Sequence, residues 1–148
     1  MKVDFKEYND SQEEALIAMM RTFYDGEGYP FVEKKVRESI HDIVNDPSLG
    51  EIIIIEKAKE LVGYFILTLG YSFEYTGRYV LLDELFIKQS FRHMEIGSTA
   101  LTFIEMRAKA YSATAIFLEV EKRNQSARKL YAKRGFELVD RQQLKKVL

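Results

Sequence analysis

The sequence has no cysteine and no tryptophan, and it contains only two histidines and two prolines. Without cysteine, neither disulfide bonds nor thiolate metal ligands can form. His41 and His93 stand far apart and lack a set of acidic partners, so we predict no metal site. No apolar run approaches the ~20 residues of a membrane-spanning helix, and the first residues, MKVDFKEYND, hold no apolar targeting segment. We therefore expect a cytoplasmic protein that has no membrane partner.

An excess of charge of one sign is also missing, because the formal net charge is only -1. A chain without a basic excess has no electrostatic reason to bind nucleic acid, and we expect none as a partner. Apolar residues make up 47% and charged residues 30% of the chain, which is typical of a globular protein. The length of 148 residues predicts a single domain over residues 1–148.

Apolar positions spaced three and four residues apart predict helices after Ser11, over residues 32–44, over residues 96–111 and after Asn124. Ser11 and Glu14 have the spacing of a capping box, and Gly135 is placed to cap the last helix. The predicted strands are residues 51–57, 61–70, 79–87, 115–121, 136–142 and 144–148. Of these, residues 115–121 (AIFLEVE) are apolar enough to predict a central strand. This order favours a mixed sheet covered by helices on both faces, in the α/β (α+β) class.

The stretch FRHMEIGSTALTFIEM, Phe91 to Met106, joins a predicted strand to a predicted helix. The first amides of a helix lack partners inside the helix and attract anions, so such a turn can bind phosphate. Gly97 would let the backbone approach a ligand closely. The turn is not a nucleotide P-loop, which needs Gly-Lys-Ser/Thr, nor a dinucleotide fingerprint, which needs three glycines. Taken alone, this segment leaves open whether it binds a ligand.

A second segment, NQSARKLYAKRGFE, begins at Asn124. Together the two segments resemble the GNAT superfamily of acyl-coenzyme-A-dependent N-acetyltransferases. In the turn, the matches to the family pattern are Arg92, Ile96, Gly97 and Leu101. His93 and Glu95 stand where the family has glycine. The second segment matches at Asn124, Ala127, Arg128, Leu130, Tyr131, Lys133, Gly135 and Phe136. The resemblance implies a GNAT-like fold, with a mostly antiparallel sheet and a splayed pair of strands.

The resemblance also implies a role for each matching position. The backbone groups of the splayed strand that would pair with pantetheine are those of Leu85, Phe86 and Ile87. The pyrophosphate would lie beside Arg92 and against the amides of His93, Met94, Glu95, Ile96, Gly97 and Ser98. Asn124 would hold coenzyme A at its pantetheine end, and Tyr131 would be the general acid that protonates the departing thiolate. Glu84 would receive the proton of the amine.

Acetyl transfer from acetyl-CoA, the expected co-substrate, to an amine requires groups of this kind. Alkyl ammonium groups have a pKa near ~10, so a carboxylate is needed to remove a proton before attack. A free backbone N–H can stabilise the tetrahedral intermediate, and direct attack needs no side-chain nucleophile. The resemblance thus implies an N-acetyltransferase that acts on a primary amine of a small molecule or peptide. A homodimer is one option for its assembly.

Several residues keep a second interpretation. Tyr131 lies on an apolar stripe and could be a core tyrosine. Glu84, within an apolar strand, could be exposed at an edge or paired, and strand alternation predicts that Asp83 points to the opposite face. Residues 71–78, an aromatic loop, could line the acceptor pocket or pack against the fold. If the altered turn no longer binds coenzyme A, the chain would instead be a non-catalytic GNAT-fold binding or assembly module.

Glu95 is the position at which the two functional alternatives divide. A carboxylate in the first turn of a helix is stabilised by about 0.3–1 kcal/mol through the helix dipole. We expect Glu95 to lie in that turn and to occupy, electrostatically, the place of a pyrophosphate. The expected result is weak rather than absent coenzyme binding.

Overall fold

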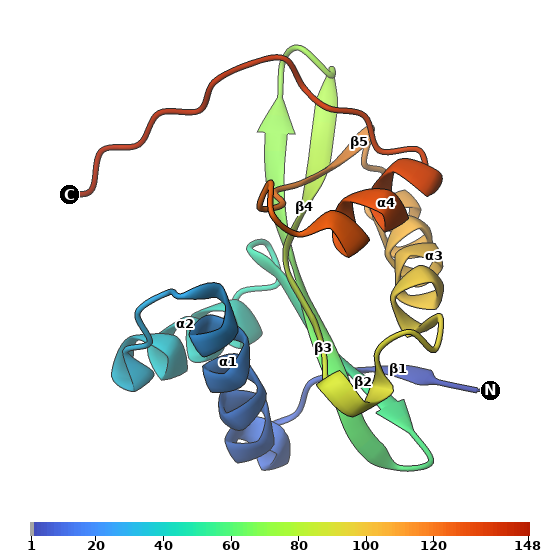
Figure 1. The fold of residues 1–148 in the computed structure, drawn as a ribbon. Coiled ribbons are helices and arrows are strands. Elements are labelled where there is room, and N and C mark those ends of the chain that lie inside the picture. The colour runs from blue at the N-terminus through green and yellow to red at the C-terminus, as the bar shows by residue number, and fades with distance from the viewer. Residues whose placement is uncertain (1) are drawn as a thin grey trace.

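The computed structural model describes residues 2–148 and contains a five-stranded sheet with helices on both sides (Figure 1). The strands are β1 (Asp4–Glu7), β2 (Gly50–Lys57), β3 (Glu60–Ser72), β4 (Gly77–Ile87) and β5 (Ala115–Leu118). The helices are α1 (Glu13–Glu27), α2 (Glu33–Asn45), α3 (Ile96–Ala110) and α4 (Gln125–Lys133), with 3-10 turns η1 (Asp10–Gln12) and η2 (Gln89–Phe91). The first four strands are antiparallel to their neighbours, and β5 runs parallel to β4. The predicted mixed, mostly antiparallel sheet is confirmed.

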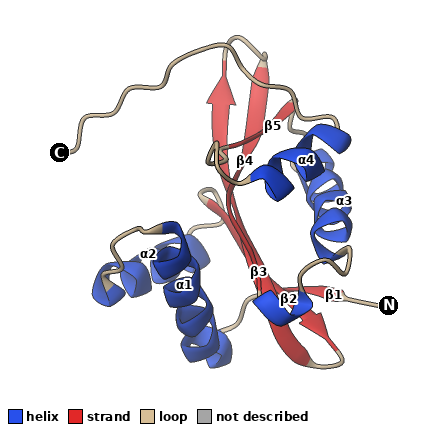
Figure 2. Ribbon diagram, in the orientation of Figure 1, coloured by secondary structure: helices blue, strands red, loops and turns tan. Residues whose placement is uncertain are grey.

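Each face of the sheet has its own hydrophobic core, because the helices divide into two pairs (Figure 2). α1 and α2 cover one face, where Leu16, Ile40 and Tyr64 are buried. α3 and α4 cover the other face, where Phe65 and Ile104 are buried. The run EIIIIEK in β2 contributes to both cores, since successive side chains of a strand point to opposite faces.

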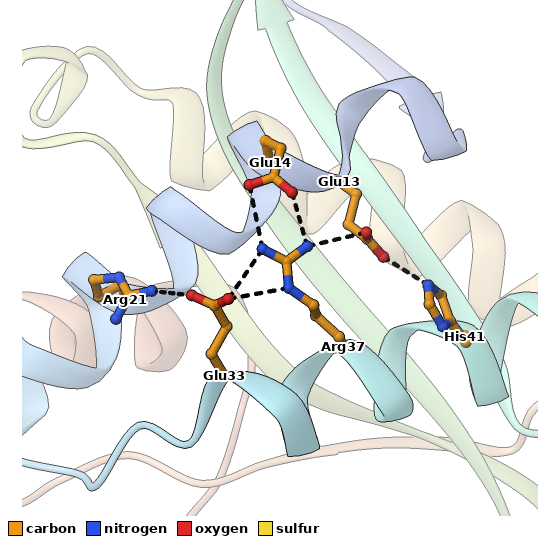
Figure 3. Close-up of polar contacts among 6 residues, drawn as sticks. All are labelled: Glu13, Glu14, Arg21, Glu33, Arg37 and His41. Carbon is orange, nitrogen blue, oxygen red and sulfur yellow. Dashed lines mark hydrogen bonds and ion pairs between the residues drawn. The ribbon is translucent and has the colours of Figure 1, made fainter.

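Ion pairs hold α1 against α2 (Figure 3). The Arg37 guanidinium of α2 donates two hydrogen bonds to Glu14 of α1, at 2.9 and 3.2 Å, and one to Glu13 at 3.0 Å. Glu33 of α2 accepts from Arg37 and also from Arg21 of α1. A bidentate arginine–carboxylate contact fixes geometry as well as adding energy. The network therefore fixes the position of α1 relative to α2.

A β-bulge interrupts β4 where this strand leaves β5. Glu84 pairs with Ile66 of β3. Leu82 pairs with the next β3 residue, Leu67, so Asp83 is an extra residue in β4. The alternation predicted for this strand is therefore broken. Leu82 is buried in the core under α3, whereas Glu84 contacts the α1 side. Pairing with β5 also ends at Leu82, so the bulge lies where the two strands separate.

The prediction of a central strand over residues 115–121 is wrong in extent and in position. β5 covers only Ala115–Leu118 and lies at the edge of the sheet, where β4 is its one partner among residues 2–148. Its apolar composition has a different cause, because both of its faces are covered. One face packs against the core under α3, and the Phe117 ring contacts those of Tyr75 and Tyr79, each at 5.2 Å between centroids.

The two strands predicted after α4 do not form, since residues 136–148 contain neither helix nor strand. The segment leaves α4, passes over the tip of the β3–β4 hairpin and ends on the side of the sheet that carries α1 and α2 (Figure 1). Arg141 donates two hydrogen bonds to Glu74 at that tip, one of them 2.8 Å long. The period-two pattern of a strand is present in the sequence, but no strand of this chain pairs with it.

The first helix begins differently from the prediction. The capping box is formed by Asn9, which precedes η1, and Gln12, which is its last residue. Ser11 and Glu14 do not form it, because the 3-10 turn precedes α1 and shifts the capping position. At the other end of the chain, Gly135 follows α4 with a φ of 92°, as predicted for a C-terminal cap.

The strands of the β3–β4 hairpin are longer than predicted. β3 extends to Ser72 and β4 begins at Gly77, so half of the predicted loop over residues 71–78 is strand and residues 73–76 form the turn. β1 is a strand that the sequence did not indicate. It has four mostly exposed residues, and such a strand carries no alternating apolar pattern.

His93 and Glu95 hold their backbone in the left-handed region, with φ values of 63° and 64°. At both positions the family pattern has glycine, the residue that adopts this conformation without strain. Glu95 precedes α3 as its N-cap residue, and its side chain caps no backbone amide. The prediction that Glu95 lies in the first turn of the helix is therefore wrong, because its left-handed φ excludes it from the helix.

Replacing Glu95 with glycine is expected to stabilise the protein without any ligand. Relief of left-handed strain, about 1–2 kcal/mol, exceeds the cost of the extra chain entropy of glycine, about 0.5–1 kcal/mol. We expect the free energy of unfolding in urea to rise by about 0.5–1 kcal/mol. The matched control is Lys59→Gly, since Lys59 has a φ of 67° in the β2–β3 turn. A gain in the control together with a loss in Glu95→Gly would show that strain at Glu95 is not the dominant effect.

Candidate active site

The second half of β4 has a free edge. β4 pairs with β5 only as far as Leu82, so the rest of the strand has no partner on that side within residues 2–148. Lys88 N–H donates to β3 at 2.8 Å. In an antiparallel pair, the backbone N–H and C=O groups of successive residues point alternately toward the partner strand and away from it. The backbone groups of Phe86 therefore also point to β3, whereas those of Leu85 and Ile87 point to the free edge. Of the three positions predicted to bind pantetheine, Phe86 is therefore not available, because its backbone groups are directed to β3.

Arg92 covers part of this free edge. Its Nε donates to the Ile87 carbonyl at 2.8 Å, and its guanidinium lies 5.7 Å from the centre of the Phe86 ring. The predicted phosphate ligand is thus folded back on the end of β4. Since the Ile87 carbonyl is occupied, Leu85 is the predicted position at which both backbone groups face the free edge without a partner in the described chain.

The N-terminus of α3 meets both β4 and α4. A Cβ on Gly97 would lie 3.2 Å from Leu130 of α4 and 3.7 Å from Ile87 of β4. Gly97 therefore permits close packing of these three elements. The amides of residues 96–98 come before the first backbone hydrogen bond of the helix, so they lack an acceptor inside it. This helix end can receive an anion as the sequence predicts.

The other predicted residues of the turn differ in what they offer a ligand. Ile96 is 1% exposed and packs in the core under α3, so only its backbone is available. The side chains of His93, Met94 and Glu95 are exposed, and that of Ser98 is half-buried.

Asn124 and Tyr131 are positioned by α4. Asn124 Oδ1 accepts the Ala127 N–H at 3.2 Å and so caps the helix, while its side-chain nitrogen donates to no other described residue. The Tyr131 ring packs against the core under α3 and contacts Phe136 edge-on at 5.8 Å. Its hydroxyl has no hydrogen-bond partner within residues 2–148 and is not fully enclosed. Burial raises the pKa of Tyr131, which keeps the phenol protonated.

Glu84 lies between two tyrosines. Tyr24 of α1 donates to Glu84 Oε2 at 2.6 Å, and Tyr64 of β3 donates to Oε1 at 2.7 Å. The carboxylate is therefore half-buried and hydrogen-bonded rather than exposed at an edge. Each of its oxygens keeps a lone pair for another proton donor. The sequence analysis missed both tyrosines, because no motif marks them and α1, β3 and β4 meet only in the folded chain.

Opposing effects set the pKa of Glu84. Burial raises this pKa, the hydrogen bonds from Tyr24 and Tyr64 lower it, and the charge of Asp83 raises it, with a net rise above the ordinary value. Partial burial also raises the pKa of Asp83, and the charge of Glu119 adds to that rise. A carboxylate with a raised pKa accepts a proton more readily.

β4 separates the predicted groups into two sets. The Glu84 side chain points toward α1, on one face of the sheet. α4, which carries Tyr131, packs on the other face together with α3 (Figure 2). On that face, the start of α3 and the end of β4 approach α4 at Gly97. A proton acceptor thus lies on one side of the strand, and a phenol and a helix N-terminus lie on the other.

Two contacts join the α1–α2 loop to the segment after β5. The Tyr29 hydroxyl donates to Glu121 at 2.8 Å, and Arg123 donates to the Glu27 carbonyl at 3.0 Å. The segment after β5 therefore reaches the helices that cover the Glu84 face. It brings the negative charge of Glu121 to that side.

Two surface hollows leave out the predicted catalytic residues. A hollow of about 350 Å³ is lined in part by Ser98, and one of about 700 Å³ is lined in part by Phe86. Glu84, Asn124 and Tyr131 line neither. Within residues 2–148, no three His, Asp or Glu side chains are grouped to hold a metal ion. In the same residues, no helix is long and apolar enough to cross a membrane.

Comparisons with solved structures give a consistent result. An integron cassette protein from the mobile metagenome of Cole Harbour Salt Marsh is 26% identical, with a TM-score of 0.86 over 97% of this chain and 90% of that chain. A predicted acetyltransferase from Clostridium acetobutylicum, solved with acetyl-CoA, is 16% identical, with a TM-score of 0.81 over 98% of this chain and 96% of that chain. AAC(6')-Iy, in complex with a bisubstrate analog of CoA and acetylneamine, is 13% identical, with a TM-score of 0.84 over 100% of this chain and 99% of that chain.

Comparison of the sequence with family models identifies the family to which the chain belongs. No curated protein matches the chain. A family model described as the acetyltransferase (GNAT) family matches residues 13–136, which is most of the chain and includes both segments that carry the resemblance. The chain therefore belongs to the GNAT family of acetyltransferases, and it is a GNAT-type N-acetyltransferase.

Proposed function

We propose that this N-acetyltransferase moves an acetyl group from acetyl-CoA to a primary amine of a small molecule or peptide by direct attack. The observation that carries the proposal is the division of the site by β4. Glu84 lies on the α1 face, and Tyr131 belongs to the opposite face, beside the N-terminus of α3. A transfer between two substrates needs such an arrangement, with the amine approaching one side of the thioester and the thiolate leaving on the other.

The residues present fit coenzyme A on the α3–α4 face. The amides of residues 96–98 have no helical acceptor and would receive the pyrophosphate together with the exposed His93. The Leu85 carbonyl and the Ile87 N–H, both on the free edge of β4, can pair with the amide groups of pantetheine. The unpaired side-chain nitrogen of Asn124 can donate to the same part of the molecule.

The chemistry then follows from two proton transfers. Glu84 takes a proton from the ammonium group, directly or through a water, and the amine nitrogen attacks the thioester carbon. The Leu85 N–H donates to the developing oxyanion. As the carbon–sulfur bond breaks, the Tyr131 hydroxyl gives its proton to the thiolate. The attacking nitrogen loses its second proton to water, and exchange with water returns Tyr131 to the phenol and Glu84 to the carboxylate. The products are an amide and the free thiol of coenzyme A.

Acidic groups near Glu84 support a cationic acceptor. Asp83 and Glu119 lie close enough for the charge of one to raise the pKa of the other, and Glu121 is held nearby by Tyr29. An ammonium group is attracted to such a region before it loses its proton. We infer that the acceptor carries a positive charge at neutral pH.

The shape of the phosphate turn supports coenzyme binding rather than a decayed site. His93 and Glu95 keep the left-handed backbone that glycine favours, despite its cost. The Glu95 side chain is exposed and makes no capping bond, so it can turn toward solvent. Its charge weakens binding of a pyrophosphate by an amount that salt screens.

Ligand-dependent stability tests this proposal directly. Thermal unfolding with acetyl-CoA, CoA or ATP should show stabilisation by acetyl-CoA and CoA and much less by ATP. At a ligand concentration a hundredfold above Kd, the gain should be roughly 2.7 kcal/mol. If neither acetyl-CoA nor CoA raises Tm, the coenzyme site is absent and the proposed reaction is wrong.

Replacing Tyr131 with phenylalanine should lower kcat by roughly 10²-fold while leaving the Kd of acetyl-CoA nearly unchanged, because a general acid is lost and little packing changes. The measurement is steady-state kinetics with an amine that the wild-type protein acetylates, together with calorimetric titration. The matched control is Tyr71→Phe, since Tyr71 is 70% exposed at the hairpin tip. A wild-type kcat in Tyr131→Phe would assign Tyr131 to packing alone.

The pH dependence of kcat/KM should report on Glu84. Glu84→Gln should lower the rate chiefly near neutral pH, where the acceptor is protonated, and less at high pH, where free amine is plentiful. In Tyr64→Phe, loss of a hydrogen bond that lowers the pKa of Glu84 should move the acid limb of the profile to higher pH, since Glu84 must be ionised to act. Ionisation of the amine affects the pH profile of kcat/KM equally in the wild-type protein and in both variants, so it does not cause a difference between them.

Two outcomes would contradict this assignment. If the deficit of Glu84→Gln is the same at every pH, Glu84 positions the substrate instead of accepting its proton. An unmoved acid limb in Tyr64→Phe would show that Glu84 does not control it.

A further inference from the structure

The C-terminal end of α1 carries negative charge that α1 itself does not balance. The helix ends at Glu27, and its last turn, residues 24–27 (YDGE), contains two carboxylates and no basic residue. The carbonyl groups at the C-terminus of a helix also carry partial negative charge and attract cations. This end of α1 can therefore bind a positively charged group from elsewhere in the chain.

Arg123, from the segment between β5 and α4, is the cation bound there. Its Nη2 donates to the Glu27 carbonyl at 3.0 Å and lies 3.8 Å from Glu27 Oε2. The Arg123 side chain is 67% exposed, so charge rather than packing holds it in place. From the same two parts of the chain, the Tyr29 hydroxyl donates to Glu121 at 2.8 Å. The two contacts together hold the end of α1 and the loop after it against the segment that follows β5.

The bound guanidinium lies on the side of α1 that meets the proposed base. Tyr24 and Glu27 are three residues apart on α1, so their side chains are neighbours on the helix surface. The Tyr24 hydroxyl donates to Glu84 at 2.6 Å, and the rings of Tyr24 and Tyr29 are 6.2 Å apart. The Glu27 carboxylate is therefore a second anionic position on the Glu84 side, and Arg123 already occupies it.

We propose that Arg123 determines acceptor specificity, because its guanidinium fills the anionic position at Glu27 that a second positive charge on the acceptor would otherwise use. The inference rests on the proposed reaction, in which the reacting amine lies at Glu84. With Arg123 in place, an acceptor gains little from a second ammonium group, since that group must displace the guanidinium. Arg123 therefore reduces the preference of the enzyme for amines with two positive charges.

The other carboxylates on this side act independently of Arg123. Partial burial and the nearby charge of Glu119 both raise the pKa of Asp83, which shows that the segment after β5 also lies close to β4. These carboxylates attract a cationic acceptor whether or not Arg123 is present. They therefore do not contribute to a difference that follows from the loss of Arg123.

Calorimetric titration of the CoA-saturated protein with hexylamine and with hexamethylenediamine tests the assignment. The two amines share one carbon chain, and only the diamine carries a second ammonium group. Arg123→Gln should raise the ratio of the hexylamine Kd to the diamine Kd by about two- to fivefold, the range that a solvent-exposed ion pair provides. The ratio removes any effect of the substitution that both amines share, such as a general change in the shape of the site.

Three further variants separate the contact at Glu27 from other effects. Arg123→Lys keeps a cation and should keep the wild-type ratio. Arg123→Gln combined with Glu27→Gln also removes the carboxylate, so the ratio should return to the wild-type value. The matched control is Lys122→Gln, which removes the same charge from the neighbouring exposed residue and should leave the ratio unchanged.

The outcomes separate this specificity from the proposed reaction. An unchanged ratio in Arg123→Gln would show that Arg123 does not set acceptor specificity, and an equal rise in Lys122→Gln would assign the effect to net charge. Failure of both amines to bind any of these proteins also overturns the inference, because no acceptor position for an alkyl amine then exists. Stabilisation by acetyl-CoA in thermal unfolding is measured without an amine, so it tests the coenzyme site alone.

Discussion

The site depends on the point at which β4 stops pairing with β5. Asp83 is an extra residue there, and the bulge it makes reverses the alternation of the strand. Leu82 can therefore belong to the core under α3 while Glu84 turns to the α1 face. The same break leaves the outward backbone groups of Leu85 without a partner among residues 2–148. One inserted residue thus provides a half-buried carboxylate on one face and free backbone groups at the strand edge.

A second constraint is the left-handed turn before α3. Two non-glycine residues there, His93 and Glu95, hold a conformation that costs energy at each position. Such strain persists only when the surroundings determine the backbone. Arg92 is bound to the Ile87 carbonyl on one side of the turn, and Gly97 packs against Leu130 on the other. The turn is therefore shaped by its anchors rather than by its own preference.

Elements with strong periodic patterns could be predicted from the sequence. The predictions were wrong where the structure depends on which strands pair with each other. The apolar runs of β2, β3 and β4 and the stripe of α3 are explicit in the sequence, because each is buried on a definite face. The edge position of β5 and the missing strands after residue 136 depend on which strands meet, and composition does not record this. Tyr24 and Tyr64 could not be predicted as partners of Glu84, since a one-residue bulge in β4 decides which face Glu84 occupies.

The two phenols also connect the position of α1 to the chemistry of Glu84. Tyr64 is held by the sheet, but Tyr24 lies on α1, and α1 is fixed on α2 by the Arg37 network. A displacement of α1 that breaks the Tyr24 hydrogen bond while Glu84 stays covered would remove one of the two hydrogen bonds that lower the pKa of Glu84 and leave burial to act with less opposition. The carboxyl group would then hold its proton more tightly, so a smaller fraction of Glu84 would be ionised at a given pH. The surface ion pairs of α1 and α2 thereby help to keep Glu84 in the ionised form that its proposed role as a base requires.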